Sequence, residues 1–219
     1  ILAIVAMPLL ANAAHAQKWD APLFFGPNPM DELGLYFVKT NEQNLNNPNP
    51  TGLKLIWRQT GNINLGVQVG TGDLENIGDA IMVGAEFYNP LRLGAASGLA
   101  MNWSLGAGAT FGKHYADLSV PLGVSVGLNL GSGSTSLTPF AHPRISFDMA
   151  TFDNPFTGRE ETVTDFGLAV DLGAELNLGK SLLIRGAYTI GNNNDTGKRD
   201  AFGVGAAFRM PRKVVARGR

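Results

Sequence analysis

Apolar and polar side chains alternate one by one over long stretches of this chain. In residues 165–179 the even positions from Phe166 to Leu178 are apolar, whereas the odd positions between them are small or polar and include Asp171 and Glu175. Successive side chains of a β-strand point to opposite faces, so this alternation predicts a strand. At roughly 3.3 Å per residue the stretch would span on the order of 45–50 Å, whereas a usual strand has about 5–6 residues.

The same pattern recurs along the chain and predicts an all-β protein of ten strands without an amphipathic helix. The predicted strands cover residues 33–37, 53–57, 63–69, 81–87, 101–112, 118–130, 145–149, 165–179, 182–190 and 202–210. A count of eight stays open, because the pattern specifies the first strand and the link at 89–98 only weakly.

The predicted connections alternate between long and short. Long polar loops are expected at residues 40–50, 71–79, 150–160 and 192–199, and short turns near 60–62, 131–134 and 179–181. One end of the structure would then carry loops and the other end only turns. An up-and-down antiparallel transmembrane β-barrel has this arrangement, with its longer loops outside and its short turns in the periplasm.

The composition of the two strand faces distinguishes a membrane barrel from a soluble one. The apolar face is rich in leucine, valine and alanine, while the opposite face carries mainly glycine, serine and asparagine with inserted charges. In a membrane barrel the apolar face meets lipid, and about 9–11 tilted residues cross the hydrocarbon. In the alternative, a soluble lipocalin-like barrel, the apolar face would point inward. We therefore expect lipid-facing apolar rows around a narrow lumen.

Aromatic residues on the apolar face fall at two heights along the predicted strands. Near the periplasmic ends are Trp57, Phe87, Trp103 and Phe208, and near the external ends are Phe37, Phe111, Phe147, Phe166, Tyr188 and Phe202. Between these two levels the face is mainly aliphatic. Aromatic side chains are enriched at both membrane interfaces, so the pattern predicts two girdles around an aliphatic band.

With these features, residues 33–210 resemble the small bacterial outer-membrane β-barrels of the OmpA-type and opacity-like class, by pattern and not by a specific motif. The resemblance implies a monomeric barrel among the lipids of a Gram-negative-type outer membrane, inserted by the outer-membrane assembly machinery. That machinery usually reads a last strand of alternating apolar residues with a terminal aromatic. Phe202, Val204, Ala206 and Phe208 match this pattern, whereas the basic residues that follow depart from it.

The two ends of the chain are expected to lie outside the barrel, which would cover residues 31–210. Residues 1–16 indicate a remnant signal peptide, because an apolar run at 1–10 leads to the cleavage pattern Ala14-His15-Ala16. Residues 17–30 would form a periplasmic lead-in, whose FFGPNP segment either packs across the periplasmic mouth or simply links. Residues 211–219 would form a basic C-terminal tail.

Charge and cysteine content exclude several classes of function. The chain has 17 lysine and arginine residues against 18 aspartate and glutamate residues, so no global field would attract nucleic acid. Cysteine is absent, which excludes disulfides, thiolate metal sites and cysteine nucleophiles.

Charged residues of both signs share the inward phase of the predicted strands: Lys54, Arg58, Glu86, Arg144, Asp148, Asp171, Glu175, Arg185 and Arg209. A three-residue turn at 179–181 would place Glu175 opposite Arg185. Buried charges are tolerated only when they are paired, so we expect ion pairs that join opposite walls and plug the lumen. The alternative is a selectivity constriction for a small solute or ion.

Candidates for catalysis or metal binding are few. His114 lies in a short loop with Asp117 three residues later, and His142 shares the inward phase with Arg144. Residues 73–75 and 192–195 offer oxygen ligands for calcium, through Asp73, Glu75 and an asparagine run, without the spacing of a calcium loop. No nucleophile elbow and no metal-ligand spacing occur, so no enzyme, metal or cofactor is expected.

These features together predict a narrow, charge-plugged barrel with a structural or interaction role. Its external loops would meet a partner that the sequence does not identify. A porin-like pore for a small solute or ion is the first alternative, and an outer-membrane enzyme is the second.

Overall fold

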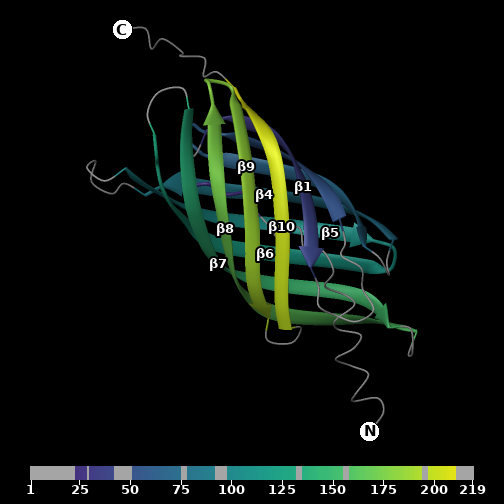
Figure 1. The fold of residues 1–219 in the computed structure, drawn as a ribbon. Helices are drawn as coiled ribbons and strands as arrows, with labels where there is room; N and C mark the ends of the chain where they lie inside the picture. The colour runs from purple at the N-terminus through teal and green to yellow at the C-terminus, as the bar shows by residue number, and fades with distance from the viewer. Residues whose placement is uncertain are drawn as a thin grey trace.

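The computed structural model of the protein describes residues 23–28, 30–41, 51–74, 78–91, 98–131, 135–154, 158–193 and 197–210. In this part of the chain ten strands form one closed barrel (Figure 1). The strands are β1 (Glu32–Asn41), β2 (Thr51–Gln59), β3 (Leu65–Leu74), β4 (Gly78–Pro90), β5 (Leu99–Gly112), β6 (Tyr115–Leu128), β7 (Thr135–Asn154), β8 (Arg159–Leu178), β9 (Leu182–Asn193) and β10 (Gly197–Arg209).

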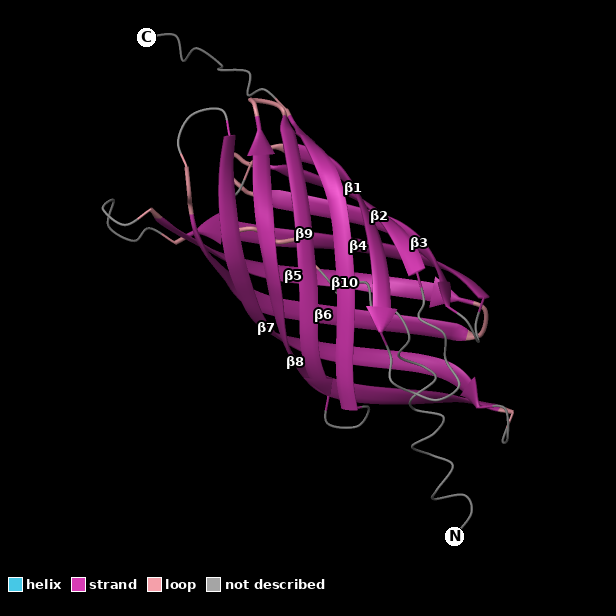
Figure 2. Ribbon diagram, viewed as in Figure 1, coloured by secondary structure: helices cyan, strands magenta, loops and turns pink. Residues whose placement is uncertain are grey.

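Each strand pairs antiparallel with its neighbours in the chain, and β1 pairs with β10 to close the barrel. Leu35 of β1, for example, pairs with Ala206 of β10 on one side and with Leu55 of β2 on the other. Figure 2 shows strands joined by loops, and among the described residues no helix is long and apolar enough to cross a membrane. The predicted all-β fold, the ten strands and the up-and-down order are confirmed.

Several strands extend further than the hydrophobic alternation predicts. The strands β7 and β8 each contain 20 residues and pair as far as Asn154 with Arg159, so most of the loop predicted at 150–160 is strand. The loops predicted at 71–79 and 192–199 are wrong for the same reason, because β3 pairs with β4 and β9 with β10 over most of these residues. Outside the hydrocarbon both faces of a strand meet water, so the alternation ends there while the backbone pairing continues.

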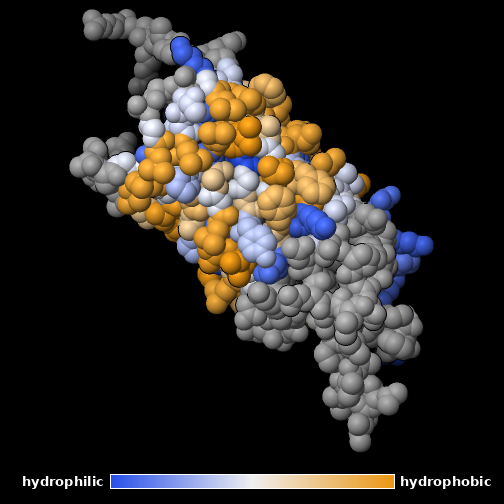
Figure 3. Space-filling view, viewed as in Figure 1, coloured by the Kyte–Doolittle hydropathy of each residue, from blue (hydrophilic) through white to orange (hydrophobic). Residues whose placement is uncertain are grey.

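The apolar rows of the strands face outward and the polar rows face inward. Leu168 of β8 is 65% exposed, whereas Asp171 and Glu175 of the same strand are 0% exposed. Figure 3 shows hydrophobic side chains gathered on the outer surface of the barrel. A soluble barrel has the opposite arrangement, with its apolar side chains inside. The surface is therefore that of a transmembrane barrel.

The turn between β8 and β9 sets the register of one charged part of the wall. Gly179 has a φ of 66°, a left-handed conformation that glycine adopts without steric cost. The turn pairs Leu178 with Leu182 and Glu175 with Arg185, which is the register that the three-residue turn predicts.

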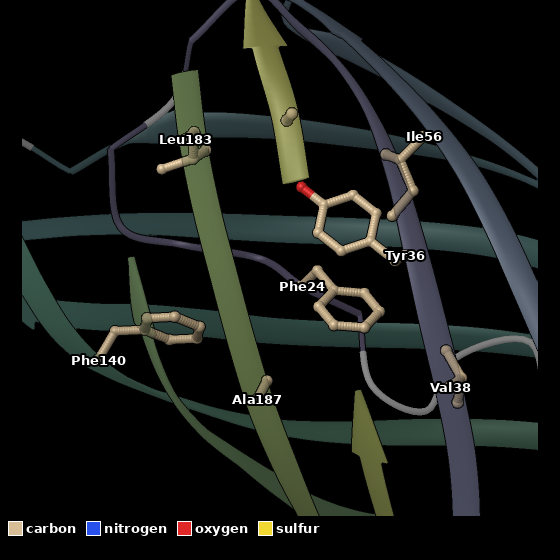
Figure 4. Packing of buried hydrophobic residues seen from close by; sticks show 8 residues of the cluster. Phe24, Tyr36, Val38, Ile56, Phe140, Leu183 and Ala187 are labelled. Carbon is tan, nitrogen blue, oxygen red and sulfur yellow. The ribbon is translucent and has the colours of Figure 1, made fainter. Parts of the chain in front are cut away.

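The buried apolar side chains of the protein lie inside the barrel. The largest cluster (Figure 4) contains Phe24, Tyr36, Val38, Ile56, Phe140, Leu183, Ala187 and Ala207. Tyr36 packs across Gly205 of the neighbouring strand, where a Cβ atom would lie only 2.4 Å from the tyrosine Cδ1. The glycine on the inner face therefore leaves the space that the aromatic ring occupies.

Candidate functional site

The interior of the barrel is the candidate functional site, because charged side chains gather there. Of the nine charged residues predicted for the lumen, eight are buried: Lys54, Arg58, Glu86, Arg144, Asp148, Asp171, Glu175 and Arg185. Arg209 is only partly buried at the end of β10, where it donates hydrogen bonds to Met30 Sδ and to Asn177 Oδ1. The structure distributes the buried charges among separate networks.

The first network links five strands through two arginines. Arg58 of β2 donates to Glu32 of β1 over 2.6 Å and also to Glu86 of β4. Arg185 of β9 donates to both carboxylate oxygens of Glu32, over 2.9 and 3.1 Å, and to Glu175 of β8 over 2.8 Å. Glu32 therefore bridges the two guanidinium groups, and the network crosses the lumen from β4 to β8.

The burial of this network explains why its members are paired. The five side chains are at most 4% exposed, and each takes part in an ion pair. Taking a charge out of water is costly unless an opposite charge and hydrogen bonds compensate it. The network therefore ties together walls of the barrel that do not pair with each other as strands.

Glu32 is a member of this network that the sequence analysis missed. It precedes the first predicted strand, at residues 33–37, and is 0% exposed. The sequence does contain a sign of this position, because Glu32 lies on the same strand face as the inward-facing Gly34 and Tyr36. Extending the alternation by one residue would have placed its carboxylate in the lumen.

The second network surrounds Asp171 of β8. Its Oδ1 accepts hydrogen bonds from Thr189 Oγ1 over 2.7 Å and from Arg144 Nη2 over 3.2 Å. Its Oδ2 lies 3.4 Å from His142 Nδ1 and accepts a hydrogen bond from the backbone N–H of Leu23 over 3.3 Å. This carboxylate thus joins β7, β8 and β9 to the segment that precedes β1.

Ser104 extends the second network to β5. Its Oγ lies 3.1 Å from His142 Nε2, so Ser104, His142 and Asp171 form one chain of polar contacts. A hydroxyl, an imidazole and a carboxylate in this order are the groups that serine hydrolases use. All three side chains are buried, and the ring centroid of Phe25 lies 5.5 Å from that of His142. The hydroxyl is therefore covered inside the barrel.

Asp148 belongs to a third, smaller group of polar side chains. It accepts hydrogen bonds from Ser119 Oγ of β6 over 2.6 Å and from Ser146 Oγ of β7 over 3.0 Å. All three residues are buried, and the two hydroxyls hold the carboxylate against the inner wall.

Residues 23–28, which we name the inner segment, lie within the barrel. Leu23, Phe24 and Phe25 are at most 3% exposed. The ring of Phe24 stacks on Tyr36 with centroids 4.3 Å apart (Figure 4), and Phe25 meets Tyr88 edge-on at 5.3 Å. The sequence placed this stretch in a periplasmic lead-in at residues 17–30, but its described part enters the lumen, because the aromatic side chains find apolar partners there. Residues 17–22 and 29 of the predicted lead-in lie outside the described residues.

Polar contacts fix the backbone of the inner segment. Arg58 donates from Nη1 to the carbonyl oxygen of Phe24 over 2.9 Å and from Nη2 to that of Leu23 over 3.1 Å. Asn102 donates to the carbonyl oxygen of Gly26 over 3.0 Å. Phe24 has a φ of 53°, a conformation that bulky residues rarely adopt and that persists only where the surroundings impose it. Arg58 therefore holds both the first network and the inner segment.

All ten aromatic residues predicted for the girdles lie on the outer face of their strands. Each of them is exposed or half-buried: Phe37, Trp57, Phe87, Trp103, Phe111, Phe147, Phe166, Tyr188, Phe202 and Phe208. Phe147 and Phe166, on β7 and β8, approach each other with ring centroids 5.3 Å apart. Their role as interface girdles stays a prediction.

The other candidate residues form no metal centre among the described residues. His114 is exposed in the turn between β5 and β6, with Nδ1 2.7 Å from Asp153 Oδ2, while Asp117 is buried on β6. No group of three or more histidine and acidic side chains in the described part could hold a metal ion. Glu75 and the side chains of Asp73 and of 192–195 lie outside that part, as do the predicted signal peptide and C-terminal tail.

Comparison with known proteins shows the fold. No family model matches the sequence, and no curated protein matches it. The structure is similar to the β domain of the Bordetella autotransporter BrkA, with a TM-score of 0.50 and 11% identity over 84% of this chain and 100% of that one. For the attachment invasion locus protein Ail of Yersinia pestis the TM-score is 0.40 and the identity is 14%, over 84% of this chain and 100% of Ail. For Neisserial surface protein A the TM-score is 0.38 and the identity is 14%, over 82% of this chain and 94% of that protein. The closed ten-stranded barrel with its apolar outer surface is a transmembrane β-barrel of the outer-membrane type.

Proposed function

We propose that the protein is a closed outer-membrane barrel with a structural or interaction role, and that it neither conducts solutes nor catalyses a reaction. The observation that supports closure most directly is the position of the inner segment. Its two phenylalanines fill the lumen between Tyr36 and Tyr88, and Arg58 binds its backbone. A barrel of about ten strands has an interior that side chains come close to filling, so a chain segment inside it leaves little room for a water path.

The ion-pair networks support the same proposal. A pore that selects ions needs charged groups that face water along its path. Here Arg58 and Arg185 form ion pairs with Glu32 within a buried network, so these charges do not face water. Such pairs hold walls together, and a permeating ion would have to separate them.

The interaction part of the proposal rests on the hairpin of β7 and β8. About 9–11 tilted residues are enough to cross the hydrocarbon, whereas each of these strands has 20 residues. The pairing of β8 with β9 begins only at Gly167, so residues 159–166 continue beyond β9, paired with β7. Figure 1 shows both strands, in green, curving along the lower side of the barrel. This extension offers a polar surface to a partner outside the membrane.

Conductance in planar lipid bilayers tests closure. We expect no stable unitary steps from the unmodified protein, and steps from a variant that lacks residues 23–28, because the lumen loses the segment that fills it. A double variant of outward-facing residues, Phe87→Ala with Phe208→Ala, is the matched control and should show no unitary conductance steps. Stable steps from the unmodified protein, with an ion preference altered by Arg144→Ala or Asp171→Asn, would instead support the pore.

The same proposal predicts that Ser104 is inert. A fluorophosphonate reacts with activated serine hydroxyls, and the cover that Phe25 forms over His142 should keep it away from Ser104. Labelling of the unmodified protein that disappears in both Ser104→Ala and His142→Ala would contradict a non-enzymatic role and would support an outer-membrane hydrolase.

A further inference from the structure

A groove of about 840 Å³ crosses the outer surface of five neighbouring strands, β5 to β9. One side of this groove, which we name the wall groove, is a row of outward-facing residues: Trp103, Val124, Pro143, Val170 and Ile190. Trp103 pairs with Val124, Pro143 with Val170, and Val170 with Ile190, so the row runs along the hydrogen-bonding direction of the sheet.

The other side of the wall groove is a shorter row on the three middle strands, β6 to β8, and on each of them it lies two residues away from the first row. Leu122 of β6 pairs with Ile145 of β7, which pairs with Leu168 of β8. Between the two rows lie Gly123, which has no side chain, and residues such as Arg144, whose side chain is buried in the barrel, so backbone forms the floor. Neighbouring strands are about 4.8 Å apart, so a groove over five strands extends on the order of 19 Å.

Side-chain size explains why the surface is hollow there. The middle of the first row consists of the short side chains of Val124, Pro143 and Val170, while Trp103 closes one end. Proline has no backbone N–H and cannot donate to a sheet ladder. Strand β6 pairs with β7 at Gly123 and again at Val126, but not at the two positions between them, where Pro143 lies opposite.

The wall groove lies in the part of the surface that faces hydrocarbon. Its lining is almost wholly apolar, and the outward-facing Phe147 and Phe166 lie two residues beyond Ile145 and Leu168 on β7 and β8. A second copy of the chain would need an interface of about 800 Å² on each partner. A channel bounded by two single rows of side chains fits a thin, flexible and apolar molecule better than the convex wall of another barrel.

We propose that the wall groove holds one acyl chain of a membrane lipid in a fixed position. Binding rests on the transmembrane fold and on this groove alone, so it does not depend on whether the lumen is closed.

The tryptophans of the chain offer a direct test, because the protein has three, at positions 19, 57 and 103. Trp103 lies at one end of the groove, and Trp57 lies on β2, outside it. One protein keeps only Trp103 (Trp19→Phe, Trp57→Phe), and its matched control keeps only Trp57 (Trp19→Phe, Trp103→Phe). Both are reconstituted in phosphatidylcholine vesicles, and lysophosphatidylcholine with a brominated acyl chain is added in small mole fractions as the quencher.

We expect the fluorescence of Trp103 to fall in a saturable way, and unbrominated lysophosphatidylcholine to reverse the effect. The fluorescence of Trp57 should fall in proportion to the added probe, because that residue meets only exchanging lipid. Val170→Phe fills the middle of the groove and should remove the saturable part. Val204→Phe, an outward-facing change on β10, should leave it intact.

Two results would overturn the proposal. One is a pair of quenching curves for Trp103 and Trp57 that coincide, in folded protein checked by its different gel mobility with and without boiling. The other is a dimer that sediments as such in detergent and is lost in Val170→Phe, which would assign the groove to a second copy of the chain. If Val170→Phe does not fold, Val124→Phe fills the same row and replaces it.

Discussion

Glu32 accepts hydrogen bonds from both Arg58 and Arg185, so a change at this residue disturbs both halves of the first network. We predict that Glu32→Gln lowers the free energy of unfolding by about 3–5 kcal/mol, because it leaves two buried guanidinium groups with less compensating charge. Urea unfolding in detergent micelles, followed by tryptophan fluorescence, measures this difference.

The control for this prediction is Glu160→Gln, which changes an exposed carboxylate of β8 in the same chemical way. A surface substitution of this kind should stay within about 0.5 kcal/mol. A loss for Glu32→Gln that is no larger than the control would show that Glu86 and Glu175 balance the two arginines without Glu32.

Individual residues of the site differ in how far the sequence could place them. The pairing of Glu175 with Arg185 follows from alternation and a short turn, because both act within a few residues of chain. The positions of Phe24 and Phe25 do not follow from either. Several partners of this segment are far away in the sequence: Phe25 meets Tyr88, and Leu23 binds Asp171, which lies 148 positions later. No local pattern separates a segment that fills a lumen from one that lies across its mouth.

At the level of one element, the turn between β8 and β9 depends on Gly179. We predict that Gly179→Ala destabilises the barrel by about 1–2 kcal/mol, because an L-residue is strained in the left-handed conformation. A Cβ atom at Gly179 would meet nothing within 4 Å, so backbone strain alone is measured. The comparison is Gly61→Ala in another turn, where the nearest heavy atom to a Cβ lies at 3.8 Å. Equal urea midpoints for the two variants would contradict the prediction.

The strands themselves were predictable at their centres and not at their ends. The alternation in β7 indicates a strand only at residues 145–149, although the strand has 20 residues. Its first half carries Pro139 and Pro143 outward and Phe140 inward, which weakens the contrast between the two faces. Its far end lies beyond the stretch where one face meets lipid. In both places the backbone of β7 continues to pair with β8. Backbone pairing does not depend on which side chains are apolar, so the hydrophobic pattern does not predict it.

For the whole molecule, the outward direction of the apolar rows can be tested at the middle of a strand. Leu55 lies at the centre of β2, pairs with Leu35 and Val69, and is 43% exposed on the outer surface. An arginine on the lipid face near the bilayer midplane costs about 2–4 kcal/mol, and one near the interfaces about 0–1 kcal/mol. We therefore predict a loss of the larger size for Leu55→Arg in lipid vesicles. The matched variant is Thr162→Arg, on the part of β8 that extends beyond β9, and it should show the smaller loss. If urea unfolding gave equal losses for the two variants, the row that contains Leu55 would be facing water, and the surface assigned here to lipid would be the surface of a soluble barrel.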